Sequence, residues 1–202
     1  MNEPFAEFIR SRLGPNTLVI LCGLPATGKS TAARQIAQMK GFSILATDAV
    51  RREILRGENI FDPAVASDPE KRERVYDEVF RRAEESLSPS PGTILDGTFL
   101  TQRLRRRAAK IAARRGHRFV IIETRCSEET ALRRISERTP ESTLSNALNA
   151  QAYFENRARF EPVDISDLKK AFPSLNIIHV IVDAESDDPA DWRALDESQN
   201  ED

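Results

Sequence analysis

The chain has 202 residues, of which 40% are hydrophobic and 31% are charged, and its formal net charge is −2. This length and composition fit one α/β domain, and the small net charge excludes a global basic field for nucleic acid or an anionic membrane. No stretch is long enough to span a bilayer, and the N-terminal residues lack the apolar core of a signal peptide. The two cysteines, Cys22 and Cys126, have no metal-binding spacing. We therefore expect a cytoplasmic protein that makes no membrane contact.

Short apolar runs alternate along the chain with longer segments of helical periodicity. Strands are expected at Thr17–Cys22, Phe42–Ala46, Thr93–Leu95, Arg118–Glu123 and Asn176–Val182. Helices are expected at Lys29–Met39, Asp48–Arg56, Glu70–Leu87, Gln102–Arg115, Glu128–Arg138 and Leu144–Arg159. The alternation predicts a parallel sheet with helices on both faces, and ligands of such sheets bind beyond the carboxyl ends of the strands. The acidic tail that follows Asp183 is expected to fray.

The first strand is followed by the sequence GLPATGKST, which matches the phosphate-loop motif G-x-x-x-x-G-K-[ST] without departure. Two glycines allow backbone conformations in which successive N–H groups face a phosphate, and the helix N-terminus assists them. Lys29 supplies a charge to the β and γ oxygens, and the Ser30 hydroxyl is the expected Mg²⁺ ligand. A chance glycine turn is the alternative. The residues expected to bind the nucleotide are Gly23, Pro25, Ala26, Thr27, Gly28, Lys29, Ser30 and Thr31.

Asp48 follows the second strand and is placed to enter the site from the carboxyl end of the sheet. A carboxylate there can accept the proton of an attacking hydroxyl group. Arg51 lies three positions later on the same helical face and could hold an anionic acceptor. The alternative is that Thr47 or Asp48 only caps the helix.

Asp96 follows the third strand, within Asp96-Gly97-Thr98-Phe99. A carboxylate at this strand end can orient Mg²⁺ through water or contact the acceptor. An Asp-Gly turn is the alternative.

Arginines gather in two places. The run from Arg103 to Arg115 lies on one predicted helix, either as a solvated face with acidic partners or as a nucleic-acid groove. Arg134 and Arg138 share a helix face before the polar segment Thr139–Asn149, which could act as a lid. Arginines on such a lid can stabilise the charge of a transferring phosphoryl group, whereas the alternative is an ordinary helix surface.

The motifs GLPATGKST, TDAVR, ILDGTFL and TRCSEETALRRISER together resemble the P-loop kinases of the AAA_33 type, a group similar to the kinase domain of phage polynucleotide kinase. The resemblance spans about Leu18 to Asp183. It implies a nucleoside-monophosphate-kinase-like P-loop fold of three α/β/α layers, with a five-stranded parallel sheet in the order 2-3-1-4-5 and a helical lid. It divides the chain into a kinase domain, residues 1–185 with a lid at about 134–160, and an acidic tail, residues 186–202.

The resemblance also implies roles position by position. Asp48 matches a general base, Arg51 an arginine on the acceptor's phosphate, and Asp96 the aspartate after the third strand. Arg138, and with it Arg134, match lid arginines that contact ATP. We therefore expect an enzyme that uses ATP and Mg²⁺ to phosphorylate a hydroxyl group, with Lys29, Asp48 and Arg138 as catalytic residues.

The acceptor stays open between a polynucleotide 5′-hydroxyl and a small hydroxylated metabolite or antibiotic. A regulatory ATPase without an acceptor is the third hypothesis. The segment Gly57–Pro69, where acceptor contacts are expected, carries no known motif.

Overall fold

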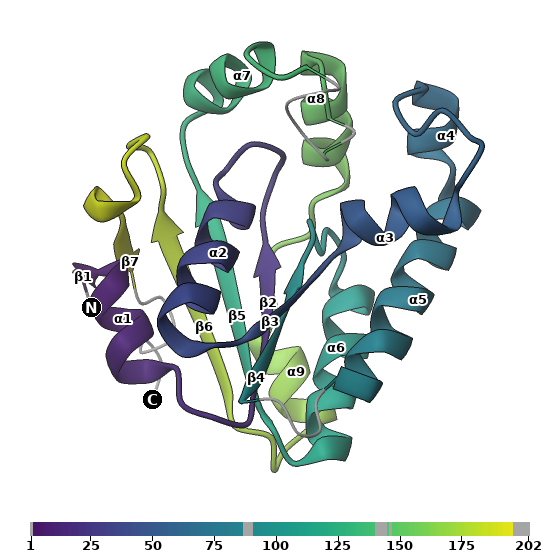
Figure 1. The fold of residues 1–202 in the computed structure, drawn as a ribbon. Helices are drawn as coiled ribbons and strands as arrows, with labels where there is room; N and C mark the ends of the chain where they lie inside the picture. Colours follow the sequence, from purple (N-terminus) through teal and green to yellow (C-terminus); the bar gives the residue numbers. More distant parts are fainter. Residues whose placement is uncertain (1, 87–90, 140–144, 146, 196–202) are drawn as a thin grey trace.

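The computed structural model describes residues 2–86, 91–139, 145 and 147–195, and these build one seven-stranded sheet between two layers of helices (Figure 1). The order across the sheet is β1-β7-β6-β5-β2-β4-β3. The strands are β1 (Asn2–Pro4), β2 (Thr17–Cys22), β3 (Ser43–Ala46), β4 (Gly92–Asp96), β5 (Arg118–Arg125), β6 (Ile177–Asp183) and β7 (Arg193–Leu195).

The five predicted strands are all present, and they lie parallel in the predicted order. The predicted strand count of five is too small, because β7 and β1 extend the β6 edge as antiparallel strands. Each has only three residues, which is too short for a periodic pattern to reveal it.

The segment expected to fray after Asp183 instead continues the fold through Leu195. It forms a short 3₁₀ helix, η1 (Pro189–Asp191), and then β7. Trp192 lies between them, is only 3% exposed, and accepts a hydrogen bond at its carbonyl from the Phe5 backbone N–H. The structure describes nothing of residues 196–202.

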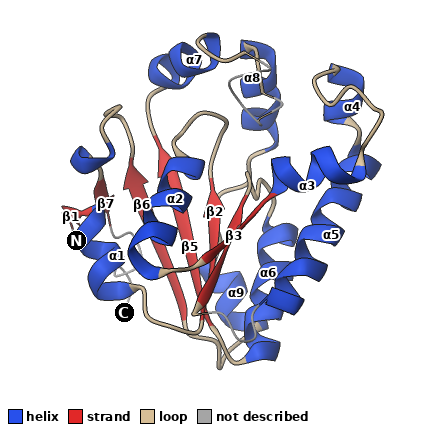
Figure 2. Cartoon of the chain, viewed as in Figure 1, coloured by secondary structure: helices blue, strands red, loops and turns tan. Residues whose placement is uncertain are grey.

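The helices are divided between the two faces and the upper edge of the sheet (Figure 2). One face carries α1 (Phe5–Arg12) and α2 (Lys29–Lys40), and the other carries α3 (Thr47–Ile54), α5 (Pro69–Ser86), α6 (Gln102–Arg115) and α9 (Ile165–Ala171). Beyond the carboxyl ends of the strands lie α4 (Pro63–Ser67), α7 (Glu128–Ser136) and α8 (Ala150–Arg159). The helix expected from Leu144 begins at Ala150, and part of the Thr139–Asn149 segment lies outside the described residues. None of the helices in the described ranges has the length and hydropathy to cross a membrane.

Strand β2 lies in the middle of the core, and all six of its residues are buried. Leu18 and Ile20 pack into the cluster beneath α5 and α6, whereas Val19 and Leu21 pack into the cluster beneath α1 and α2. Burial on both faces explains why the sequence shows a continuous apolar run here rather than alternation.

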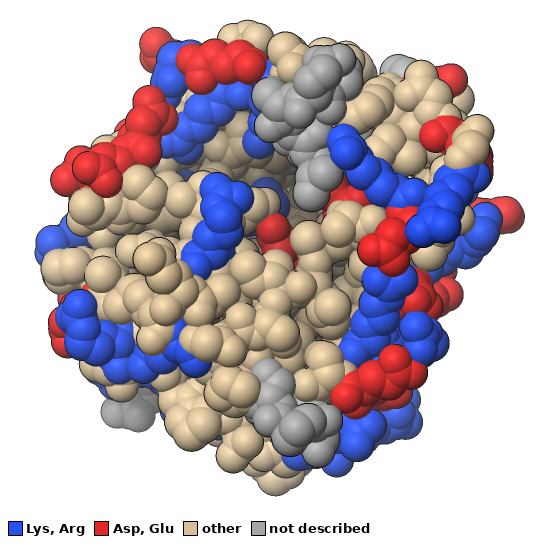
Figure 3. Space-filling view, viewed as in Figure 1, with Lys and Arg blue, Asp and Glu red and all other residues tan. Residues whose placement is uncertain are grey.

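The arginine-rich helix α6 is an ion-paired surface, as the solvated alternative held. Four of its arginines pair with carboxylates of neighbouring helices: Arg103 with Glu73, Arg106 with Asp167, Arg107 with Glu73 and Asp77, and Arg114 with Glu84. Basic and acidic side chains interleave over α5 in the space-filling view (Figure 3). Because acidic side chains face these four arginines, they do not form an open basic groove.

Arg105 differs from its neighbours because it is fully buried. Its guanidinium donates to the carbonyls of Phe99, Glu161 and Pro162, at 3.0, 2.6 and 2.8 Å, and lies over the Phe160 ring. This side chain therefore ties the segment that leaves α8 to the loop that follows β4.

Replacing Arg105 tests that bridge. We expect Arg105→Met to lower the free energy of unfolding by about 3 kcal/mol, because the buried carbonyls of Phe99 and Leu100 and the part-buried carbonyls of Glu161 and Pro162 lose a charged donor. Arg114→Met on the same helix removes only the exposed pair with Glu84, and should cost less than about 1 kcal/mol. Urea denaturation of both variants measures the difference, and equal losses would contradict the bridge.

Candidate functional site

The phosphate-loop motif connects β2 to α2 and has the strained backbone that its glycines suggest. Gly23 and Gly28 have φ values of 135° and 92°, and Ala26 is also left-handed at 64°. A Cβ atom on Gly23 would lie 2.6 Å from the Thr124 carbonyl oxygen. Thr27 faces inward, where its hydroxyl donates to the Leu24 carbonyl (2.9 Å) and lies 2.8 Å from that of Thr124. Thr124 of β5 thus contacts the loop at Gly23 and Thr27 and fixes its position on the sheet.

Trp192 packs directly against this loop, and the sequence alone gave no sign of it. A Cβ atom on Gly28 would lie 2.5 Å from Cη2 of the Trp192 ring. The indole N–H donates to the Ser186 carbonyl at 2.8 Å, which fixes the ring. The segment between η1 and β7 therefore packs against the phosphate loop at its second glycine.

Lys29, Ser30 and Asp96 come together at the start of α2. The Ser30 hydroxyl hydrogen-bonds to Asp96, which is 8% exposed, and burial raises the pKa of this carboxyl. Burial likewise lowers the pKa of Lys29 to about 8, with Asp96 opposing the shift and Arg138 adding to it. Opposite charges are therefore held close together with little water around them, an arrangement typical of functional sites.

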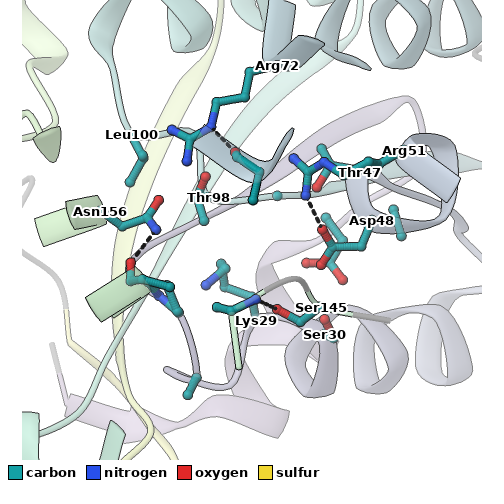
Figure 4. Close-up of a pocket in the computed structure, with 18 of the residues that line it drawn as sticks. Lys29, Ser30, Thr47, Asp48, Arg51, Arg72, Thr98, Leu100, Ser145 and Asn156 are labelled. Carbon is teal, nitrogen blue, oxygen red and sulfur yellow. Dashed lines mark hydrogen bonds and ion pairs between the residues drawn. The ribbon is translucent and has the colours of Figure 1, made fainter. Parts of the chain in front are cut away.

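Asp48 lies in the first turn of α3 and pairs with Arg51 at 2.9 Å, as Figure 4 shows. Burial raises the pKa of Asp48, and its neighbour Asp96 raises it further, whereas Arg51, Lys29 and Arg138 oppose the shift. The cap residue of α3 is Ala46, without a side-chain cap bond, so Asp48 is not the helix cap. The alignment of Ala46 with Asp96 across β3 and β4 brings both carboxylates to one strand edge.

Arg134 and Arg138 both line the same cavity, but they are engaged differently. Every guanidinium nitrogen of Arg134 donates within the protein, to Asp187 and to the carbonyls of Ala26, Ala184, Glu185 and Ser186. Among the described residues, Arg138 donates to the Ser145 hydroxyl and to the Ala147 carbonyl, and the negative charge of Asp48 acts on it. That either arginine contacts ATP stays a prediction.

A cavity of about 770 Å³ joins these groups. Of the predicted site residues, Gly23 and Thr27 lie behind its wall, and the others line it. The cavity continues past Asp48 to a region lined by Phe61, Ala66, Ser67, Pro69, Arg72, Tyr76, Asn156 and Arg159. Four of these belong to Gly57–Pro69, the segment without a motif. Sequence reasoning missed Arg72 and Arg159, because each lies in a helix with several other charged residues and the pattern does not show which arginine faces the cavity.

The family of the chain follows from its sequence match. The AAA_33 family model, described as an AAA domain, matches residues 18–163. The chain belongs to the AAA_33 family. The match contains the phosphate loop, both carboxylates and the two lid arginines.

Curated relatives match just over half of the chain. The protein Rv2004c of Mycobacterium tuberculosis and Mb2027c of Mycobacterium bovis, both named as uncharacterized, are each 35% identical over 116 residues. The match takes in 54% of the present chain and 23% of each relative, so the chain spans about a quarter of their length.

Solved structures share the P-loop kinase-like fold. Kti12 of Chaetomium thermophilum, solved with ADP-AlF3, aligns at a TM-score of 0.57 and 18% identity over 80% of this chain and 88% of its own. A sugar kinase of Janibacter sp. HTCC2649 aligns at a TM-score of 0.57 and 16% identity, over 83% of this chain and 86% of its own. A gluconokinase of Sinorhizobium meliloti 1021 aligns at a TM-score of 0.53 and 19% identity, over 84% of each chain. At such identities the likeness is one of fold.

The contact between Gly28 and Trp192 yields a direct prediction. We expect Gly28→Ala to displace the indole, and the emission of the single tryptophan to shift to the red as the ring gains water. Gly41→Ala is the matched control, because Gly41 also has a positive φ (69°) but nothing within 4 Å of the added methyl. Fluorescence spectra of the two variants measure the effect, and identical spectra would show that the loop does not rest on the ring.

The raised pKa of Asp96 predicts how stability depends on pH. Because the folded pKa lies above the unfolded one, the free energy of unfolding falls as pH rises through the folded value. At neutral pH the ionised carboxylate therefore destabilises the protein without ligand. We expect Asp96→Asn to raise the urea midpoint at pH 7. The gain should vanish near about pH 3, where the protonated Asp96 of the wild type is as neutral as the asparagine of the variant. A lower midpoint for Asp96→Asn at pH 7, in buffer without Mg²⁺, would refute this.

Proposed function

We propose that this protein is an ATP-dependent phosphotransferase that moves the γ-phosphate of ATP to a hydroxyl group of an acceptor. The observation that carries the proposal is the shared cavity, which runs from the phosphate loop past Asp48 into a second region with polar walls. A nucleotide in the loop would leave that second region for an acceptor. Two structural neighbours, named as a sugar kinase and a gluconokinase, agree with a small hydroxylated acceptor.

Each residue of the site has a separate role in the transfer. The loop N–H groups and Lys29 hold the β and γ phosphates, and Arg138 stabilises negative charge that develops on the γ group. Asp48 orients the acceptor hydroxyl and takes its proton as the new oxygen–phosphorus bond forms. The bond from the γ-phosphorus to the bridging oxygen breaks in the same step, and ADP leaves with that electron pair.

The residues also fit a divalent cation. The Ser30 hydroxyl and the Asp96 carboxylate lie within hydrogen-bond distance of each other, and both are hard oxygen ligands of the kind that Mg²⁺ binds. The carboxylate is buried, so little water solvates its charge. Mg²⁺ held there would neutralise charge on the β and γ phosphates.

A regulatory ATPase without an acceptor would not need the region beyond Asp48. In such a protein the space between Asp48 and the γ-phosphate would be filled by side chains. Here that side of the cavity is lined by Thr47, Thr98 and Leu100, which leave it continuous with the phosphate loop (Figure 4). This geometry favours the phosphotransferase.

The role of Asp48 is testable with an acceptor panel of hydroxylated metabolites and 5′-hydroxyl oligonucleotides. We expect Asp48→Asn to lower kcat by about 10²–10⁴-fold, the usual worth of a general base, with KM for ATP little changed. The wild-type rate should rise with pH through a pKa above that of an ordinary aspartate, and this rise should be absent in Asp48→Asn. Release of ADP and labelled product measures both effects.

Asp77→Asn is the control, because Asp77 pairs with Arg107 on the outer surface, away from the cavity. Transfer by Asp48→Asn at the wild-type rate would rule out the base assignment. ATP hydrolysis without transfer to any member of the panel would favour the regulatory ATPase.

A further inference from the structure

Three arginines from three different helices line the acceptor side of the cavity. Arg51 comes from α3, Arg72 from α5 and Arg159 from the last turn of α8. Figure 4 shows Arg72 between Arg51 and Asn156, on the side of the cavity away from Ser30. Elements distant in sequence therefore bring positive charge to one place.

Arg72 is the central member of this group. It is half-buried, and its Nε atom donates to the Ala66 carbonyl at 2.8 Å, which holds the side chain against α4. Burial lowers the pKa of Arg72 to about 10, and the charges of Arg159 and Arg51 lower it further, against smaller opposite effects of Tyr76 and Glu155. No ion pair joins Arg72 to a carboxylate in the described ranges.

Arg159 likewise has no ion pair within the part of the chain that the structure describes, and it is exposed to the cavity. The contrast with Arg157 is informative, because Arg157 lies two residues earlier and pairs with Glu128 on the outer side of α8. Glu155, the carboxylate on the cavity side, accepts a hydrogen bond from Gln151 instead.

Like charges held together in a partly buried site destabilise the protein unless an anion joins them. Elsewhere in the fold, arginines on α5, α6 and α7 have carboxylate partners, so this chain has ample acidic residues for pairing. Of Arg51, Arg72 and Arg159, only Arg51 pairs with a carboxylate of the described residues, namely Asp48. Guanidinium groups bind phosphate and carboxylate oxygens in pairs, which suits a forked site for an oxyanion.

We propose that Arg51, Arg72 and Arg159 bind an oxyanion group, phosphate or carboxylate, of a small acceptor molecule, and so select anionic hydroxyl compounds over neutral ones. The proposal rests on the phosphotransferase function and names the class of its second substrate. Arg72 and Arg159 would hold the anionic end, while Asp48 faces the hydroxyl that receives the phosphoryl group. The occupant is a small molecule rather than a nucleic acid strand, because four arginines of the neighbouring α6 surface are neutralised by acidic partners.

Binding of labelled inorganic phosphate to the full-length chain tests the site. The phosphate loop is first saturated with Mg²⁺ and the non-hydrolysable analogue AMP-PNP, and equilibrium dialysis then measures phosphate bound elsewhere. We expect Arg72→Gln and Arg159→Gln each to weaken phosphate binding by about tenfold or more. Arg74→Gln should leave it unchanged, because Arg74 is exposed on the same helix as Arg72 and does not line the cavity.

Paired acceptors test the selection itself. Glycerol 3-phosphate and gluconate should compete with labelled phosphate, whereas glycerol and glucose should not. Unchanged binding in both Arg72→Gln and Arg159→Gln, or competition by the neutral compounds, would overturn the proposal. Competition by 5′-hydroxyl oligonucleotides alone would overturn the small acceptor in favour of a nucleic acid end.

The readouts separate this proposal from the function on which it rests. Phosphate binding needs no turnover, so it can succeed even if no transfer occurs. Loss of transfer in Asp48→Asn together with phosphate binding unaffected in Arg72→Gln and Arg159→Gln would leave the phosphotransferase standing and remove only the anionic acceptor.

Discussion

The concentration of charge at the carboxyl end of β2, β3 and β4 is the constraint on which the rest of the structure depends. Lys29, Asp48, Asp96 and Arg51 are held together where burial works against the charged form of each carboxylate and of the lysine. Such a cluster does not assemble by its own attraction, since desolvation opposes it. It persists because the fully buried strands β2 and β4 fix the positions of Lys29 and Asp96, and the pairing of β3 with β4 brings Asp48 and Arg51 beside them.

Two further arginines hold together the backbone segments around this cluster. Arg105 ties the exit of α8 to the loop after β4, and Arg134 ties α7 to the segment after β6 and to Ala26. A small apolar cluster of Ala26, Ala131, Ile135 and Tyr153 packs α7 and α8 against the phosphate loop. The two helices are thus joined to the loop both by polar bonds and by packing.

The sequence predicted the parts of this protein that are governed by local pattern. The five parallel strands were predictable because each is a short apolar run, and the phosphate loop because its glycines and lysine must stand at fixed spacing. The strand pair β1–β7 was not predictable, since three residues define no period. The contact of Trp192 with Gly28 was not predictable either, because it depends on a C-terminal segment that returns along the β6 edge of the sheet. The roles of Asp48, Arg51 and Arg138 stay predictions that the geometry supports.

The arginines show most clearly where sequence reasoning ends. Five arginines that the sequence does not distinguish, Arg72, Arg105, Arg106, Arg134 and Arg159, all lie in helices among other charges. The fold makes Arg105 and Arg134 bridges to backbone carbonyls and Arg106 a surface ion pair. Arg72 and Arg159 line the cavity without a carboxylate partner among the described residues. The difference depends on which hydrogen-bond acceptor of another helix, strand or loop lies nearest to each guanidinium, and residue spacing in the sequence does not reveal this. An arginine that pairs with a carboxylate, or that donates from all of its guanidinium nitrogens within the protein, contributes to the fold whether or not ligand is present. Arg72 and Arg159 have no carboxylate partner among the described residues and lie beside other arginines, which destabilises the site until an anion binds. These two arginines are therefore the ones that point to the substrate.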